Sequence, residues 1–163
     1  MINGKTGHLY DTILVWPKTW YVETHFKLLG TAGNFFNLFH FTTGYQNRVY
    51  GSRIPGIWIK PAFFIRCIVD ANGFVSDFFT NYRNTNLIVG ITYHVRVEQV
   101  FDLAKSKYVI RFYVNRLLFE EKENSQASEF QNVKVYTCNP WHACDGEFAI
   151  YGFKYGPLPD ASA

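Results

Sequence analysis

The stretch ITYHVRVEQV, residues 91–100, decides the fold. Apolar and polar residues alternate along it, and a period of two residues is typical of a strand with one buried face. A shift of one residue would bury Arg96 and Glu98, which is costly for charged groups. The stretch therefore predicts a β-strand whose polar face points outward. The apolar set is Ile91, Tyr93, Val95 and Val97, and the polar set is Thr92, His94, Arg96 and Glu98.

The next predicted strand continues this polar face. Residues 108–114 alternate in the same way, and a short hairpin turn follows them. If residues 102–107 connect two antiparallel strands, Arg111 and Tyr113 join the polar set of the first strand. We therefore expect one sheet face that combines charged groups with an aromatic ring.

Strand signals recur along the rest of the chain, and helix signals do not. Gly, Asn, Asp and Pro mark turns between short apolar segments, as in DANG at 70–73. The polar segment 120–128 is interpreted as a loop. Many short strands separated by turns predict an all-β fold, a two-sheet antiparallel β-sandwich of the jelly-roll kind. The expected strands are 20–28, 35–43, 55–59, 63–69, 74–80, 91–100, 108–114, 117–121, 133–137 and 148–153.

Length bounds the organisation of the chain. At 163 residues the chain has the size of one domain, which buries roughly 70% of the surface that its unfolded chain exposes. We therefore expect a single β-sandwich domain over residues 1–163, with a flexible tail at 157–163.

Charge and hydropathy argue against two kinds of partner. The net charge is +3 and no basic run or Lys/Arg stripe is present, so nucleic acid is not expected. No apolar run approaches the roughly 20 residues of a membrane span, so membrane insertion is not expected. Residues 1–10 are polar and lack the layout of a secretion signal. The chain is therefore either cytosolic or a segment that begins after a leader.

The three cysteines leave two interpretations open. Cys138 and Cys144 flank a short loop that contains proline, and a disulfide between them is geometrically reasonable, with Cys67 as a buried free thiol. The alternative is three reduced cysteines in a cytosolic protein. No Cys-x-x-Cys pair and no Cys/His spacing of a zinc site is present, so a structural metal is not expected.

Five segments carry a resemblance that spans about residues 16–155. They are NLFHFTTG (37–44), GSRIPGIW (51–58), YHVRVEQ (93–99), FQNVKVY (130–136) and NPW (139–141), the last followed by Gly146. With the hairpin at Val114-Asn115, they resemble the central and closing strands of laminin-G-like domains in the concanavalin A-like lectin/glucanase superfamily. The resemblance implies a jelly-roll sandwich in a superfamily that holds lectins, adhesion modules and hydrolases.

The residues that glucanases of this superfamily use are missing. Retaining glycosidases need two carboxylates about 5 Å apart, and the resemblance would place them in a Glu-x-Asp-x-x-Glu strand. Glu98 stands alone on its strand, and Glu120, Glu121 and Glu123 fall in the polar segment. No Gly-x-Ser-x-Gly elbow is present either. We therefore expect a chain that is not an enzyme.

The polar sheet face is the first candidate for binding. Alternation along 20–28 adds Glu23, His25 and Lys27 to it if the strands are neighbours. Sugars require groups that hydrogen-bond to hydroxyls and a ring that stacks on their C–H face. The alternative is a solvated face with weak cross-strand ion pairs. The expected ligand-binding residues are Arg96 as donor, Tyr113 as platform, and His94, Glu98 and Arg111 around them.

A second candidate lies in the first half of the chain. The order of His40, Asn47, Arg48, Arg53 and Trp58 is similar to that of the His, Asn, Arg and Trp that hold the sugar in galectins, although the spacing differs. His40, Arg48 and Arg53 are therefore candidate ligand-binding residues. The alternative is structural, with Arg53 paired internally and Trp58 in the core.

Loops at the rim of the sandwich are the third candidate. Trp141 and His142, with Asp145 beside them, would form an aromatic and acidic tip in the loop between Cys138 and Cys144.

Calcium is the one candidate ion, because side-chain oxygens at and after the turn 70–73 are of the kind that calcium binds. The alternative is that this turn forms without metal. No other cofactor is expected. The candidate calcium ligands are Asp70, Asn72 and Asp77.

The missing catalytic groups and the resemblance together predict a binding module. The first hypothesis is a glycan-binding, lectin-like or adhesive module. The second is a structural or self-assembling β-sandwich that acts through protein contacts of exposed Phe and Tyr. The expected partners are a carbohydrate, an extracellular protein or further copies of the chain, and the expected place is outside the cell or on its surface.

Overall fold

The computed structural model consists of strands and the turns between them. It describes residues 2–3, 7–30, 34–45, 48–60, 64–83, 87–141, 144 and 146–158. None of these residues lies in a helix, so the described chain contains no apolar helix long enough to cross a membrane. The prediction of an all-β fold is confirmed.

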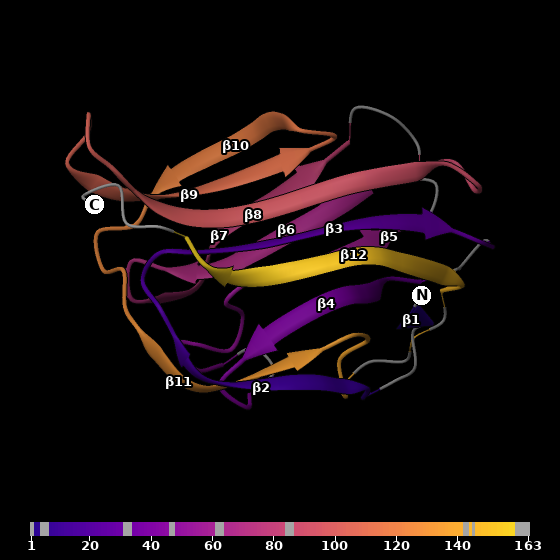
Figure 1. Cartoon of the computed structure of the whole chain (residues 1–163), viewed down its shortest axis with the longest axis horizontal. Coiled ribbons are helices and arrows are strands. Elements are labelled where there is room, and N and C mark those ends of the chain that lie inside the picture. Colours follow the sequence, from indigo (N-terminus) through magenta and orange to yellow (C-terminus); the bar gives the residue numbers. More distant parts are fainter. Residues whose placement is uncertain are drawn as a thin grey trace.

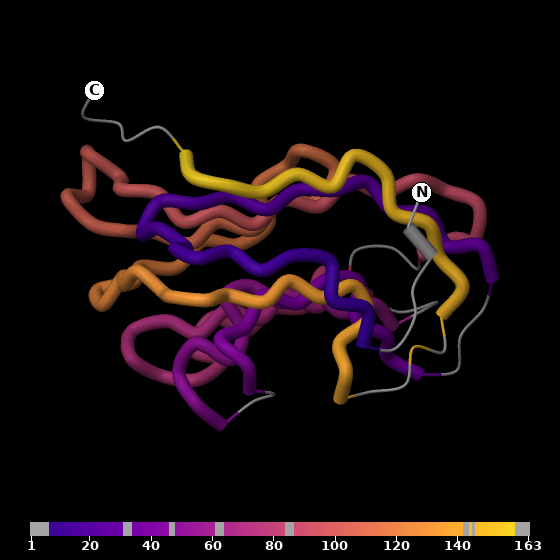
Figure 2. Tube along the Cα trace, turned by 60° about the horizontal axis from the view of Figure 1, so that its bottom comes forward, coloured from indigo at the N-terminus to yellow at the C-terminus, as the bar shows by residue number. Residues whose placement is uncertain are grey.

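The described strands form two six-stranded sheets in which every pairing is antiparallel. In Figure 1 sheet A crosses in front of β5, β6 and β7, and Figure 2 shows the two layers from another side. Sheet A contains, in spatial order, β1 (Ile2–Asn3), β12 (Phe148–Pro157), β3 (Trp20–Leu28), β8 (Thr92–Asp102), β9 (Lys107–Val114) and β10 (Leu117–Glu123). Sheet B contains β2 (Leu9–Trp16), β11 (Phe130–Tyr136), β4 (Phe36–Thr42), β5 (Gly56–Lys60), β6 (Phe64–Ala71) and β7 (Phe74–Tyr82).

The core lies between the two layers and is rich in aromatic rings. Every second side chain of β3 is buried from Trp20 to Leu28, which is the pattern of a strand with one face in the core. On β8 the same pattern buries Tyr93, Val95 and Val97. The two-sheet sandwich predicted from alternation is therefore confirmed. The largest fully buried side chains are Trp16, Trp20, Phe26, Phe36, Phe39, Phe41, Phe78, Phe112 and Phe148.

Three expectations about strand boundaries are corrected. Ile91 is exposed rather than buried, because β8 begins at Thr92 and Ile91 precedes the ladder. β2 is missed by the sequence pattern, since its side chains are mostly exposed on both faces and do not alternate. Residues 122–123, expected in a loop after the strand at 117–121, belong to β10, where Glu121 and Glu123 form ion pairs with cations of β9.

The C-terminal strand extends further than expected. Pro157 is the last residue of β12, and the backbone N–H of Leu158 donates to the carbonyl of Thr19 at 3.3 Å. The expected flexible tail therefore does not begin at 157, and residues 159–163 lie outside the described part of the chain.

Candidate functional site

The polar residues of three strands meet on the outer face of sheet A. Register places Arg96 of β8 opposite Glu23 of β3 and Tyr113 of β9, and it places His94 opposite His25. The antiparallel pairing of β8 with β9 through the predicted connection is confirmed. Cross-strand neighbours on one face lie within side-chain reach of one another. Alternation along each strand therefore assembles one polar surface.

Ion pairs and a hydrogen bond join four of these side chains into one network. The Arg96 guanidinium donates to Glu23 Oε2 at 2.9 Å and to Glu98 Oε2 at 2.7 Å. Tyr113 Oη donates to the other oxygen of Glu98 at 3.0 Å. Arg96 also lies over the ring of Tyr21, with 4.7 Å from Cζ to the ring centroid. These contacts fix the side chains, since Glu98 is only 8% exposed and few other positions are open to it.

Two histidine rings lie side by side at one end of this side-chain network. The ring centroids of His25 and His94 are 4.7 Å apart, and His94 Nε2 is 3.8 Å from Glu23 Oε2. His94 Nδ1 is buried and has no hydrogen-bond partner among the described residues. Burial lowers the pKa of His94, and the neighbouring His25, Arg116 and Arg96 lower it further against the opposing effect of Glu23. The imidazole of His94 is therefore neutral at pH 7.

These groups surround an open hollow of about 400 Å³, called here the sheet A hollow. Four of the predicted binding residues, His94, Arg96, Glu98 and Tyr113, line it. Sequence reasoning missed the roles of Arg116 and Lys154 in this hollow. The complete lining is Glu23, His25, His94, Arg96, Glu98, Tyr113, Arg116 and Lys154.

Arg111 lies on the same outer face but outside the hollow. Its guanidinium donates to Asp102 at 2.7 Å and to Glu121 at 2.6 Å, and Glu121 also pairs with Lys105. Asp102 ends β8 and Glu121 lies on β10, the two strands that flank β9. Arg111 therefore holds the hairpins together at this edge.

The second candidate, on the outer face of sheet B, is closed rather than open. His40 on β4 is 1% exposed, and its Nε2 lies 2.5 Å from the carbonyl oxygen of Ser52. A carbonyl only accepts, so Nε2 carries the proton and Nδ1 accepts from Asn139 Nδ2 at 3.4 Å. Trp58 and Trp141 flank the ring, each at a centroid distance of 5.4 Å. His40 is thus enclosed on the outer face of its sheet.

The other described members of this candidate lie apart from His40 or contact neighbouring side chains. Arg53 Nη1 donates to Ser76 Oγ at 2.6 Å, and its guanidinium carbon lies 5.4 Å from the centroid of the Trp58 ring. Trp58 is buried on the outer face of β5 and does not join the core cluster. Arg48 is exposed in the loop after β4, and Asn47 lies outside the described residues.

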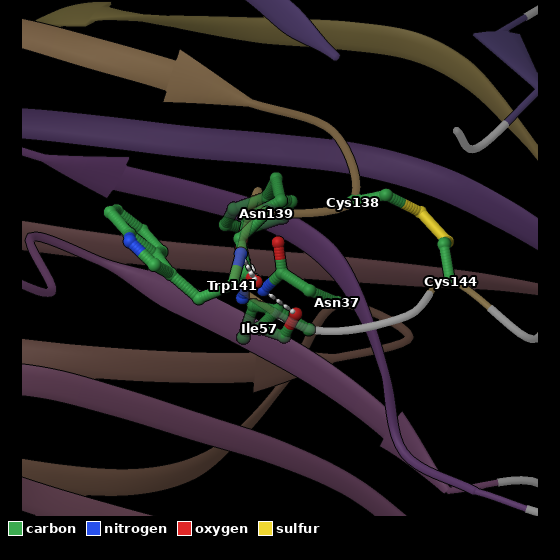
Figure 3. The surroundings of a disulfide bond; sticks show 7 residues. Asn37, Ile57, Cys138, Asn139, Trp141 and Cys144 are labelled. Atoms are coloured by element: carbon green, nitrogen blue, oxygen red, sulfur yellow. Dashed lines mark hydrogen bonds between the residues drawn. A yellow bond between two sulfur atoms is a disulfide. The ribbon is translucent and has the colours of Figure 1, made fainter. Parts of the chain in front are cut away.

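The rim loop contains a disulfide in the structure. Cys138, just after β11, is bonded to Cys144, and their Cα atoms are 5.7 Å apart (Figure 3). Cys67 on β6 is a buried free thiol, and burial raises its pKa well above the ordinary range. Near the disulfide, Asn37 Nδ2 donates to the carbonyl of Ile57 at 3.0 Å where the β4–β5 register shifts.

Trp141 packs against the sheet more than it projects from it. Its half-buried indole contacts His40 and Tyr136, with ring centroids 5.4 Å and 6.0 Å away. His142 and Asp145, the other members of the expected tip, lie outside the described residues.

The oxygens considered for calcium are engaged in hydrogen bonds. Asp77 Oδ2 accepts from Asn72 Nδ2 at 2.7 Å and pairs with Lys122 at 2.9 Å. Asp70 accepts hydrogen bonds from four donors on the loop after β4 and on β7. Within the described part of the chain, no three His, Cys, Asp or Glu side chains are grouped so that they could hold a metal ion.

Comparison with known proteins gives no sequence relative but several structural ones. No protein-family model and no curated protein matches the chain. The carbohydrate-binding module CBM66 from Bacillus subtilis matches with 14% identity and a TM-score of 0.53, over 94% of this chain and 84% of that one. The chain is a jelly roll.

Two further jelly rolls show how broad this fold is. An alginate lyase from Pseudomonas aeruginosa matches with 8% identity and a TM-score of 0.59, over 86% of this chain and 65% of the lyase. The CBM40 module of a Ruminococcus gnavus sialidase, bound to α2,3-sialyllactose, matches with 13% identity and a TM-score of 0.52, over 97% and 94%. At these identities the likeness establishes the fold alone.

The expectation that the chain is not an enzyme is corrected by these similarities. Alginate and glucuronan lyases are among the matching jelly rolls, so the fold includes enzymes. The expectation relied on a missing pair of carboxylates, which glycoside hydrolysis requires. Elimination next to a sugar carboxylate requires a base, an acid and a group that faces the carboxylate instead. The missing pair therefore does not exclude an enzyme.

Proposed function

We propose that the chain binds a glycan in the sheet A hollow. The observation that carries the proposal is an open volume of about 400 Å³ surrounded by polar groups that hold one another in place. Arg96 is fixed by ion pairs of 2.9 and 2.7 Å to Glu23 and Glu98. Fixed donors and acceptors lose little entropy when a ligand arrives, which favours binding of sugar hydroxyls.

Tyr113 supplies the aromatic element of this site. Its ring is half-buried at the wall of the hollow, and the hydrogen bond from Oη to Glu98 limits its rotation. Burial, together with the charge of Glu98, raises the pKa of Tyr113 and keeps the phenol protonated at neutral pH. A fixed, neutral ring is a suitable surface for the C–H face of a sugar.

The structural comparisons support the choice of ligand class. Two of the jelly rolls compared above are carbohydrate-binding modules, and one of them is bound to a sialylated sugar. A glycan ligand for this chain therefore agrees with the use of the same fold in those proteins.

A second candidate function is glycan cleavage by elimination in the same hollow. The observation that favours it is the presence of neutral His94 and protonated Tyr113 in the lining of the same hollow. His94 would take the proton next to a sugar carboxylate, a carbon–carbon double bond would form, and the glycosidic C–O bond would break. Tyr113 would protonate the leaving oxygen. An increase in ultraviolet absorbance from the unsaturated product on incubation with an acidic polysaccharide tests this candidate.

If the chain is an adhesive module, as the laminin-G-like resemblance suggests, it would also contact other proteins. In support, β2 is an edge strand of sheet B and exposes Leu9, Tyr10, Leu14 and Val15. Exposed apolar edge strands pair readily with other chains, including copies of the same chain. The disulfide between Cys138 and Cys144 supports an extracellular place, because disulfides persist in oxidising compartments.

A glycan array, run with and without calcium, tests the proposed function. We expect binding by the unmodified chain and its loss in Tyr113→Ala. Trp141→Ala is the matched control, since it removes an aromatic ring from the rim on sheet B. Loss of binding in the Trp141 variant with full binding by the Tyr113 variant would move the site to the rim loop.

A further inference from the structure

A strained hairpin turn places Arg116 at the sheet A hollow. Asn115 and Arg116 close the β9–β10 hairpin, and both have positive φ angles, of 50° and 69°. Two-residue turns of this kind prefer glycine at the second position, because a side chain there is unfavourable. The turn is tied to the site, since Asn115 Oδ1 accepts from the backbone N–H of His94 at 3.0 Å. The chain therefore carries an arginine where the backbone favours glycine.

A β-bulge places a second cation, Lys154, at the same hollow. β12 pairs Tyr151 with His25 and Lys154 with Glu23, so two residues of β12 face the single residue Thr24. Gly152 in the bulge has a φ of 59°. The extra residue reverses the alternation that buries Ile150, and without it Lys154 would point into the core. The bulge therefore turns this lysine outward, where it lines the hollow.

The remaining charges of the hollow are already paired with one another. Arg96 pairs with both Glu23 and Glu98 at distances below 3 Å and offsets one of their two negative charges. Lys154 Nζ stays 4.0 Å from Glu23 and is 66% exposed, and Arg116 forms no ion pair with any described residue. The lining thus holds three permanent cations against two carboxylates. The lining therefore has a net charge of +1: Arg116 carries a positive charge with no carboxylate partner among the described residues, and Lys154 contacts Glu23 only at the 4.0 Å limit of an ion pair.

We propose that the sheet A hollow selects an anionic sugar, whose carboxylate or sulfate group is bound by Arg116 and Lys154. The inference rests on the proposed function and names its ligand class. A guanidinium and an ammonium both form charge-assisted hydrogen bonds with such oxyanions. A binding role for Arg116 also gives a reason for an arginine at a position with φ of 69°.

Calorimetric titration with three matched probes tests the inference. The probes are an oligogalacturonate, its fully methyl-esterified form, which keeps the hydroxyls but loses the charge, and a sulfated galactan oligosaccharide. We expect the oligogalacturonate to bind about tenfold more tightly than its ester, because one charge-assisted contact is lost. Its affinity should also fall as salt increases. The sulfated probe shows whether the hollow accepts both anionic groups or only the planar carboxylate.

The variant Arg116→Gly separates binding from stability. Glycine suits the turn, so we expect the melting temperature to stay unchanged or to rise by about 2–4 °C. Affinity for the oligogalacturonate should fall about tenfold, while affinity for the ester stays the same. Lys154→Gln should act in the same direction on affinity. Lys134→Gln, an exposed lysine on β11 of sheet B, is the matched control and should change neither.

The outcomes distinguish this inference from the proposed function. Equal affinity for the acid and the ester, with both lost in Tyr113→Ala, would overturn the anionic preference and leave glycan binding intact. If none of the three probes binds, both the anionic preference and glycan binding are overturned for these sugar types. Preference for the acid that persists in the Arg116 and Lys154 variants would place the anion elsewhere and contradict the inference.

Discussion

The outer faces of the two sheets carry similar residue types in opposite arrangements. On sheet B, His40 is enclosed between Trp58 and Trp141, and both of its ring nitrogens have partners. On sheet A, His94 borders an open hollow, and its buried Nδ1 has no partner among the described residues. A list of histidine, arginine and aromatic residues therefore does not identify a site. Openness separates the two surfaces, because His94 borders a hollow of about 400 Å³ whereas His40 is 1% exposed. Buried polar atoms without a partner among the described residues occur on both sides, at His94 Nδ1 and at Arg53 Nε.

The largest effect expected from this comparison comes from Asp70, which lies on β6 and faces the outer side of sheet B. Its carboxylate accepts hydrogen bonds from Gly51 N, Ser52 Oγ, Arg53 N and Ser76 N, so Asp70→Ala leaves buried donors without an acceptor. We expect a loss of about 3 kcal/mol in the free energy of unfolding, measured with urea. Glycan affinity of the folded protein should not change.

Glu123→Ala is the control for the Asp70 variant. Glu123 is an exposed carboxylate whose partner, Lys107, is equally exposed, and we expect a loss below about 0.5 kcal/mol. If the two variants lower the free energy of unfolding by the same amount, the Asp70 network on sheet B has no special structural role and the contrast between the faces is lost.

Arg96→Ala should have an intermediate effect, on both stability and binding. It leaves Glu98, which is 8% exposed, beside Glu23 without a cation between them. We expect a loss of about 1–2 kcal/mol in urea unfolding, together with loss of glycan binding. Adding Glu98→Gln should recover part of the stability, because an uncompensated charge is removed. Stability that falls further in the double variant would contradict the ion-pair account.

The smallest expected effect is a dependence on pH through His94. Its folded pKa lies below the ordinary value of about 6.5, so the unfolded chain binds the proton more readily. The contribution of neutral His94 to the free energy of unfolding is complete above the unfolded pKa of about 6.5. It declines as the pH falls from there through the lower folded pKa. The hollow beside His94 is open to water, which screens the neighbouring charges, so we expect a change of less than about 1 kcal/mol between about pH 7.5 and pH 5.5. His94→Gln should flatten this part of the urea-unfolding profile, and an unchanged slope would assign the dependence to other groups.

Alternation predicts six of the eight residues that line the sheet A hollow and fails for Lys154 and Arg116. It places Arg96 and Tyr113 on a shared outer face because both strands are regular and one face of each is buried. Alternation does not predict the position of Lys154, because a bulge reverses the pattern within β12. Gly152 is a sequence signal for this bulge, since a glycine inside a strand often marks one. Arg116 lies in a recognised hairpin turn, but its proximity to His94 depends on the pairing of β8 with β9.

The closed face of sheet B could not be predicted in this way. His40 sits on the polar-facing side of β4, and its burial depends on Trp141 and Asn139, which lie about 100 residues away in sequence. The alternation of residues within β4 carries no information about distant side chains that cover His40. β2 was missed for the opposite reason, because an edge strand with exposed apolar residues shows no burial period.

An NMR titration of the isotopically labelled chain with an oligogalacturonate tests the central claim most directly. The account predicts that backbone amide shifts concentrate at residues 92–98 and 113–116 and at Lys154, around the sheet A hollow. The amides near His40, Trp58 and Trp141 should stay in place. Shifts that concentrate around Trp58 and Trp141 instead, with the amides of the hollow unmoved, would contradict it.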